Sequence, residues 1–157
     1  MLMHELAAQP VGPKGTPMAE QCLAVRVRLL SRRLSRIYDA ALRPLGLTVA
    51  QLNVLSVLEV IDSAPSGRVA NLLAMEISTL SRNARILEGE GWITIDRAAR
   101  GNGRILGLTS AGRQKLRKAR PAWERAQAEA RELLGDEGAR DLKRLGDDVW
   151  DDQLRRV

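Results

Sequence analysis

A polar run between residues 78 and 85 combines side chains that can read the edges of DNA bases. Arginine can form a bidentate pair with guanine, asparagine can do so with adenine, and short hydroxyls can reach phosphates or base edges. Leu80, Ala84 and Leu87 are spaced to face a core from one side of a helix. The candidate base-reading residues on the rest of this helix are Ser78, Thr79, Ser81, Arg82, Asn83 and Arg85. This pattern favours a major-groove helix, and its alternative is a polar face that only keeps a helix soluble.

A basic segment that follows this helix predicts a β-hairpin. Residues 92–97 alternate apolar and polar side chains, Gly101-Asn102-Gly103 is a turn signal, and residues 104–108 return as a second strand. Arginines on one short turn repel each other without an anion. The candidate contacts of this hairpin with the minor groove are Arg97, Arg100, Asn102 and Arg104. A helix-turn-helix followed by a basic hairpin indicates a winged helix-turn-helix that binds duplex DNA.

Charge is distributed unevenly along the chain. Residues 97–120 hold eight basic residues and no acidic one, whereas residues 124–152 hold ten acidic residues against five basic ones. The basic block indicates a polyanionic partner, and the C-terminal segment is not expected to touch phosphate. Within the block, phosphate contacts or general attraction, rather than base readout, are expected of Arg113, Lys115, Arg117 and Lys118.

Composition narrows the class of protein. The chain has 157 residues, a net charge of +6 and 45% apolar residues, which is enough for one ordinary domain. It shows no membrane-length apolar span and no signal peptide, and its single cysteine is Cys22, so we expect a cytoplasmic protein that does not act in a membrane. One cysteine and one histidine cannot form a metal cluster, and no cofactor is expected. P-loop, nucleophile-elbow and metal-ligand motifs are absent from the sequence, so an enzyme is not expected.

The elements before the polar helix follow from apolar spacing and caps. A helix is expected over residues 19–42 and is ended by Pro44 and Gly46. Thr48 is expected to cap a second helix that reaches Ile61, and the segment SAPSG is read as a turn. Ser66 is expected to cap a short third helix, and the polar helix should then run over about residues 78–90.

The elements after the polar helix are predicted in the same way. Gly91 occupies the position of a left-handed helix cap. Thr109 or Ser110 is expected to cap a long helix that reaches residue 133, with Pro121 bending or splitting it. After a break at Gly135, a last helix is expected over about residues 137–154.

Several segments in order resemble the MarR family of winged helix-turn-helix transcriptional regulators. They are LRPLGLTVAQLNVL, then GRVANLLAMEISTLSRNARILEGEGWI, then the hairpin and LTSAGRQKL, and the similarity covers about residues 20–155. The resemblance implies a mainly α fold with a small β-wing. The domain plan is a flexible tail (1–18), a dimerisation helix (19–44), a winged helix-turn-helix domain (45–109) and C-terminal dimerisation helices (110–157).

The resemblance also implies a homodimer whose two recognition helices enter successive major grooves of a near-palindromic operator. The sequence favours a dimer independently, because the first helix and the helices after Thr109 carry more apolar positions than one small winged core could cover. One departure from the family concerns its Asp-x-Arg signature at the wing tip, where this chain has Arg100-Gly101-Asn102. Either Arg100 or Arg104 replaces the usual minor-groove contact, or the wing binds with less sequence preference.

The resemblance implies two kinds of signal. Many relatives release DNA when a small aromatic or phenolic effector binds, and Tyr38, Trp92 and Trp123 are the candidate pocket residues, with core packing as their alternative role. A peroxide-sensing branch oxidises a cysteine near the start of the first helix. Cys22 lies about two residues before that position, and its alternative role is that of a small buried hydrophobe.

The sequence thus predicts a homodimeric, sequence-specific DNA-binding transcriptional regulator. Its most favoured form is a repressor that a small-molecule ligand releases from its operator. The alternatives are a redox-sensing regulator that uses Cys22, and a non-specific DNA-binding or protein-interaction module that keeps the fold.

Overall fold

The computed structural model describes residues 17–101 and 103–155, and the chain divides between Leu34 and Ser35 into two compact units. Most of the predicted N-terminal tail lies outside the described residues. The first unit contains helix α1 (Met18–Gln21) and the start of helix α2 (Leu23–Leu42). The expected continuous helix over residues 19–42 is wrong at one point, because Cys22 has an extended backbone with ψ of 113°. At this break, Arg26 Nη1 donates a 3.0 Å hydrogen bond to the Ala19 carbonyl.

In the second unit, the end of α2 is joined to the winged domain by hydrogen bonds. A 3₁₀ turn, η1 (Arg43–Leu45), ends at Gly46 with φ of 67°. Helix α3 (Val49–Ile61) then begins with the predicted Thr48 cap, in which Thr48 Oγ1 accepts from the Gln51 amide and Gln51 Oε1 accepts from the Thr48 amide. Asp39 Oδ1 of α2 accepts a 2.7 Å hydrogen bond from the Val49 amide. The start of α3 is therefore fixed from two sides.

The helix-turn-helix consists of α4 (Ser66–Leu72) and α5 (Ile77–Gly89). Its turn contains Ala74 with φ of 48°, a left-handed conformation that is uncommon for a residue other than glycine. The prediction that Ser66 caps the first of these helices is wrong. Ser66 is already helical, and Pro65 before it is the N-cap residue and makes no side-chain cap hydrogen bond.

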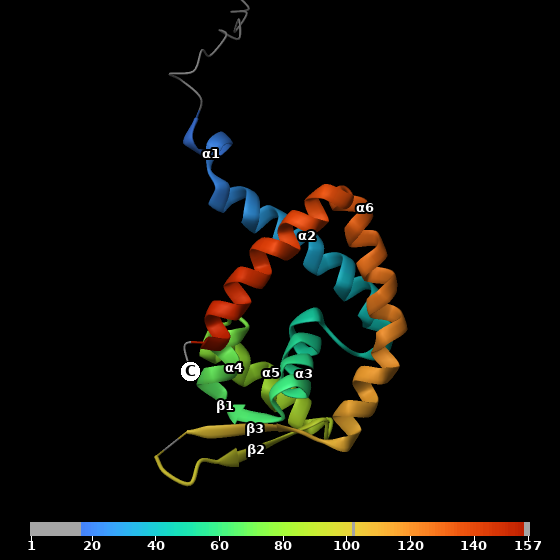
Figure 1. Ribbon diagram of the computed structural model, residues 1–157. Coiled ribbons are helices and arrows are strands. Elements are labelled where there is room, and N and C mark those ends of the chain that lie inside the picture. The colour runs from blue at the N-terminus through green and yellow to red at the C-terminus, as the bar shows by residue number, and fades with distance from the viewer. Residues whose placement is uncertain (1–16, 102, 156–157) are drawn as a thin grey trace, which may run out of the picture. The chain divides into compact units, whose positions relative to one another are not determined.

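The predicted hairpin is confirmed as strands β2 (Ile93–Arg97) and β3 (Arg104–Leu108) (Figure 1). The end of α5 leads into it through Gly91 with φ of 73°, and the Trp92 amide donates to the Leu87 carbonyl, as expected of a glycine cap. The segment read as a turn contributes a further strand, β1 (Ser63–Pro65), which pairs with β3. The sheet is antiparallel in the order β1-β3-β2.

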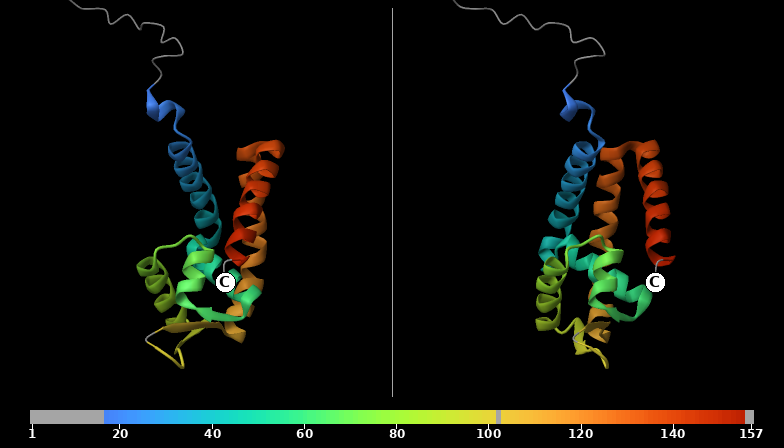
Figure 2. Two further views of the ribbon diagram at one scale, coloured as in Figure 1. Left: turned by 60° about the vertical axis from the view of Figure 1, so that its left-hand side comes forward. Right: turned by 90° about the vertical axis from the view of Figure 1, so that its left-hand side faces the viewer.

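Helix α6 (Ser110–Arg155) begins with the predicted Thr109 cap, because Thr109 Oγ1 accepts a 3.0 Å hydrogen bond from the Gly112 amide. Pro121 is exposed and does not split the helix, which continues through it. The predicted break occurs at Gly135, with φ of 69° and ψ of 164°. There the chain reverses direction, and the last part of α6 runs back towards α4 (Figures 1 and 2).

The core of the second unit lies between α3, the helix-turn-helix, the sheet and the start of α6. Its fully buried side chains include Leu55 and Leu58 of α3, Leu80 and Leu87 of α5, and Leu106 of β3. The core thus holds both α5 and the hairpin against α3. Among the described residues, no single helix is long and apolar enough to cross a membrane, and only the bent pair Leu23–Leu45 with Val49–Ile61 reaches that length and composition together.

Candidate nucleic-acid interface

Helix α5 presents the face that the sequence predicts for base readout. Leu80, Ala84 and Leu87 are buried. Of the candidate residues, Ser78, Ser81, Arg82 and Arg85 are exposed, whereas Thr79 and Asn83 are half-buried. Both arginines can therefore reach a ligand without any change in the core.

Two of the candidate side chains are held by Thr79, one turn earlier on the helix. Arg82 Nη2 donates a 3.2 Å hydrogen bond to Thr79 Oγ1, and Asn83 Nδ2 donates a 3.0 Å hydrogen bond to the Thr79 carbonyl. One of the two N–H groups of the Asn83 side chain is thus used by its own helix, and the other N–H group and the oxygen are left for further hydrogen bonds. Arg85 makes no such bond among the described residues and is the less constrained of the two arginines.

The hairpin brings three arginines together beyond the core. Arg97 and Arg104 are directly opposite each other on β2 and β3. Arg100 lies in the turn next to Gly101, whose φ of 79° favours glycine, and all three arginines are exposed. The remaining predicted wing residue, Asn102, lies outside the described residues.

The hairpin and α5 are fixed to the start of α6 at one junction. Thr109 Oγ1 donates a 2.7 Å hydrogen bond to the Gly91 carbonyl, and the Thr109 amide donates to the Trp92 carbonyl at 3.1 Å. Gly112 approaches so closely that a Cβ atom there would lie 2.1 Å from the Trp92 carbonyl oxygen. Lys115 Nζ lies 4.2 Å from the centroid of the Trp92 ring. This junction sets the direction in which the hairpin leaves the core.

Two of the four α6 cations expected to attract phosphate are engaged by other groups of the same chain. Arg113 forms a 2.5 Å ion pair with Asp62, a residue with φ of 62° at the end of α3. Lys115 Nζ donates a 2.5 Å hydrogen bond to the Leu45 carbonyl. Arg117 and Lys118 are exposed. The positive charge of all four still contributes to the field around the interface.

Arg68 of α4 is a candidate that the sequence reasoning missed. Its Nε atom is buried and has no hydrogen-bond partner among the described residues. The guanidinium of Arg68 carries a positive charge that can attract phosphate to this end of α4. Its place at the start of the first helix of the helix-turn-helix was the available signal, because that helix crosses the phosphate backbone in such motifs.

A pocket of about 290 Å³ lies between α3 and α6. It is lined by apolar, polar and charged side chains: Leu52, Asn53, Ser56, Glu59, Leu116, Arg117, Ala119, Arg120 and Trp123. Of the three aromatic residues predicted to line an effector site, this lining includes Trp123. Trp92 lies under Lys115, and the Tyr38 hydroxyl donates a short hydrogen bond to Gln127 Oε1 of α6. Burial raises the pKa of the Tyr38 hydroxyl above its usual value of 10.0.

Cys22 is partly exposed at the break between α1 and α2. Within the described part of the chain, no group of three or more His, Cys, Asp or Glu side chains is arranged to hold a metal ion.

Comparison with known proteins places this arrangement among transcriptional regulators. No protein-family model and no curated protein matches the sequence. The structure is similar to that of the Mycobacterium tuberculosis transcriptional regulator MosR in complex with DNA, at 33% sequence identity over 80% of this chain and 94% of that chain, with a TM-score of 0.67.

Two further solved structures share the fold at lower identity. A mutant MarR from Escherichia coli, complexed with operator DNA, is 19% identical over 86% of this chain and 99% of that chain, with a TM-score of 0.71. A probable transcriptional regulator from Pseudomonas aeruginosa is 21% identical over 80% of this chain and 95% of that chain, with a TM-score of 0.69. The chain belongs to the MarR family of winged helix-turn-helix transcriptional regulators.

Proposed function

We propose that the chain is a homodimeric, sequence-specific DNA-binding regulator that represses transcription at a near-palindromic operator and is released by a small-molecule ligand. The observation that carries the proposal is the exposed Arg82 and Arg85 face of α5 beside a hairpin with three exposed arginines. A chain 33% identical to this one has been solved in complex with DNA. The helix would read bases in the major groove while the hairpin reaches the neighbouring minor groove.

The division of labour that we propose assigns residues 45–109 to DNA binding and residues 19–44 and 110–157 to dimerisation. Large apolar side chains are exposed in the single chain, including Leu23 (77%) and Val27 (66%) of α2 and Leu145 (54%) and Val149 (62%) of α6. A partner subunit that covers these side chains would remove them from water. Two recognition helices would then reach half-sites whose centres lie about 34–36 Å apart.

The proposed ligand is a small aromatic or phenolic molecule, and the pocket lined by Trp123 is its best-supported site. The Trp123 ring offers an apolar surface, whereas Asn53, Arg117 and Arg120 offer polar groups that can orient a ligand. Tyr38 and Trp92 stay predictions as pocket residues. Because α6 lines this pocket and also holds Trp92 at the start of the hairpin, a ligand there could act on the DNA-binding face.

Oxidation of Cys22 is the second candidate for signal input. Its side chain is partly exposed where the backbone leaves the helix, so an oxidant can reach it. A chain with Cys22→Ser that still loses its operator on peroxide treatment would exclude this route.

The experiment that tests the proposal captures fragments of the source genome on the purified full-length chain. We expect a few fragments to be enriched, each with a near-palindromic core, and binding to weaken steeply as salt rises. Equal affinity for every fragment would favour the non-specific DNA-binding module, and retention of no fragment would contradict DNA binding altogether.

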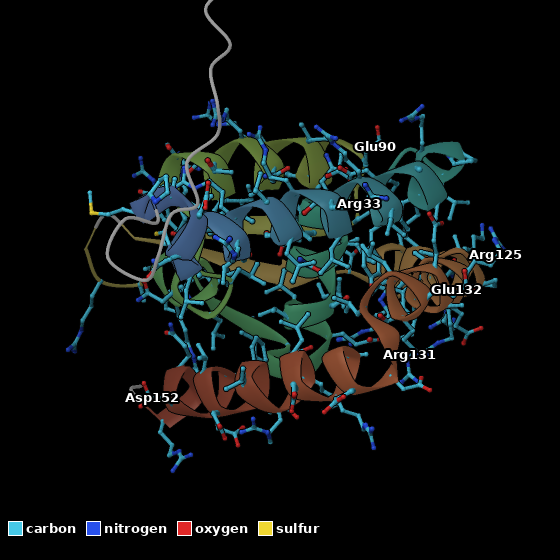
Figure 3. The ribbon with its side chains drawn as sticks, turned by 90° about the horizontal axis from the view of Figure 1, so that it is seen from above. Arg33, Glu90, Arg125, Arg131, Glu132 and Asp152 are labelled. Carbon is cyan, nitrogen blue, oxygen red and sulfur yellow. The ribbon has the colours of Figure 1, made fainter. Side chains whose placement is uncertain are left out.

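Matched variants separate the interface from general charge. Arg82→Ala and Arg85→Ala should lose the enriched fragments, whereas Arg131→Ala should retain them, since Arg131 is exposed on α6 with its side chain at the outside of the helix (Figure 3). Sedimentation analysis of the free chain should show a dimer. If the two recognition-helix variants kept every cellular activity, the protein-interaction alternative would be favoured.

A further inference from the structure

Arg97 and Arg104 form a pair of like charges across the two strands of the hairpin. The Ala98 amide donates a 2.9 Å hydrogen bond to the Gly103 carbonyl, in the pair next to them. Hydrogen-bonded and non-hydrogen-bonded pairs alternate along antiparallel strands. Arg97 and Arg104 therefore form a non-hydrogen-bonded pair, the type in which opposite side chains lie closer together.

Both arginines are on the face of the sheet that continues the core. The pairs Ile95–Leu106 and Ile93–Leu108 lie on the same face, two and four residues back along the strands. Ile93 and Leu106 belong to the same buried cluster as Leu80 and Leu87 of α5. The two guanidinium groups are thus presented on the side of the hairpin where the recognition helix packs.

No counter-charge within the described residues offsets this pair. Asp96 is adjacent in sequence, but it pairs with Ile105 and its side chain points to the opposite face of the sheet. Neither arginine takes part in an ion pair or a side-chain hydrogen bond in the described part of the chain. Like charges directly opposite each other destabilise a strand pair. An anion held between them would turn this repulsion into two charge-assisted hydrogen bonds.

We propose that Arg97 and Arg104 together form a clamp for one DNA phosphate, the one between the groove entered by α5 and the minor groove reached by the hairpin tip. The inference rests on the proposed DNA-binding function and divides the three wing arginines between two roles. The clamp supplies affinity and fixes the position of the hairpin, without reading sequence. Arg100, in the glycine-flanked turn, is the arginine that enters the minor groove.

The salt dependence of binding to random-sequence duplex tests the clamp. The logarithm of the binding constant falls against the logarithm of salt concentration with a slope of about 0.9 per neutralised phosphate. We expect the double variant Arg97→Gln with Arg104→Gln to reduce this slope by about 0.9, and each single variant to reduce it by less, because the remaining arginine still contacts the one shared phosphate. The loss of affinity should be the same for enriched genomic fragments. Arg131→Gln on α6, with its dimer verified by sedimentation, is the control for removal of one exposed positive charge and should leave the slope unchanged.

Three outcomes would overturn the clamp. A double variant whose slope falls by about 1.8 would show two independent phosphate contacts. An unchanged slope in the double variant would show that neither arginine contacts phosphate. A loss confined to the enriched fragments would show that the pair reads sequence. Arg100→Gln provides the contrast, because it should reduce the preference for A·T base pairs at the edges of the site.

Thermal unfolding without DNA gives a second measurement that does not depend on the proposed function. The double variant should unfold at the same temperature as the parent chain or a higher one in chloride, because repulsion is removed. Sulfate at matched ionic strength should raise the unfolding temperature of the parent chain more than that of the double variant. Equal sulfate shifts would overturn the anion clamp. Sulfate could raise the two unfolding temperatures unequally even though the chain binds no duplex. That result would support an anion site at the two arginines but reject both the assigned DNA phosphate and the proposed function.

Discussion

Lys115 places its ammonium nitrogen 4.2 Å from the centroid of the Trp92 ring and, at the same time, 2.5 Å from the Leu45 carbonyl oxygen. These contacts join the turn after α2, the residue that leads from α5 into β2, and the start of α6. The positive end of one side chain thus links the three segments whose relative positions decide how the hairpin lies beside α5. A residue that appears in the sequence as one more surface cation is part of the framework of the domain.

Lys115→Met should lower the free energy of unfolding by about 1–3 kcal/mol, because it removes a cation–π contact and a charged hydrogen bond while keeping an apolar stem. The measurement is urea denaturation at fixed protein concentration, since dimerisation would make stability depend on concentration. Lys118→Met is the matched control, because Lys118 is exposed on the same helix. Its effect should stay within about 0.5 kcal/mol. Equal losses in the two variants would contradict the structural role of Lys115.

Gly112→Ala should be among the most destabilising single substitutions in the chain. A Cβ atom at this position would lie 2.1 Å from the Trp92 carbonyl oxygen and 2.7 Å from Leu108 Cδ1, so α6 would have to move away from the hairpin. We expect a loss of roughly 3 kcal/mol or more in unfolding experiments, in the range of severe overpacking.

The control for this glycine is Gly146→Ala, also in α6. A Cβ atom at Gly146 would meet nothing within 4 Å. Alanine there should leave stability unchanged or raise it by about 0.5–1 kcal/mol, because it reduces the conformational freedom of the unfolded chain. A small effect at Gly112 as well would show that α6 can shift at its start without cost.

The sequence alone predicts the helices and strands whose ends are set by capping and turn residues close to them in the chain. Thr48 predicts the start of α3, Gly91 predicts the end of α5, and the glycines around residue 102 predict the hairpin, because each rule depends on residues within one turn of the chain. Strand β1 could not be predicted in this way. Its residues have little strand preference of their own, and they are extended because they pair with β3 at least 40 positions away.

The candidate site likewise has residues that local sequence places correctly and residues whose contacts only the fold determines. Periodicity alone places Arg82 and Arg85 on the exposed face of α5, since Leu80, Ala84 and Leu87 fix the buried face. The contacts of Lys115 and Arg113, and the burial of Arg68 Nε, depend on segments brought together by the fold. Likewise, the register that places Arg97 opposite Arg104 requires the observed strand pairing.

Tyr38→Phe should change how stability depends on pH at the alkaline end. Burial raises the pKa of the Tyr38 hydroxyl in the folded chain above the value of 10.0 expected when it is unfolded. The folded state then holds this proton more tightly than the unfolded state does. The contribution of the Tyr38 hydroxyl to the free energy of unfolding is therefore fully present below pH 10.0 and is lost as pH rises through the folded pKa. Phenylalanine has no such proton, so the free energy of unfolding of the variant should fall less at alkaline pH than that of the parent chain. Unfolding free energies of both chains from neutral pH to above pH 10.0 provide the measurement, and parallel curves would contradict it.

Thr79 should affect DNA recognition through Arg82, because its hydroxyl accepts a 3.2 Å hydrogen bond from Arg82 Nη2. Thr79→Val removes the acceptor but keeps a branched side chain, so Arg82 would lose its fixed direction and some of its ability to form two bonds with one guanine. We expect the preference for an enriched genomic fragment over random duplex to fall, by less than the roughly 1–3 kcal/mol expected for Arg82→Ala. Thr79→Ser keeps the hydroxyl and should behave like the parent chain. If Thr79→Ser lost preference and Thr79→Val kept it, the methyl group of Thr79 rather than its hydroxyl would be the part that matters, and Arg82 would need no support from its own helix.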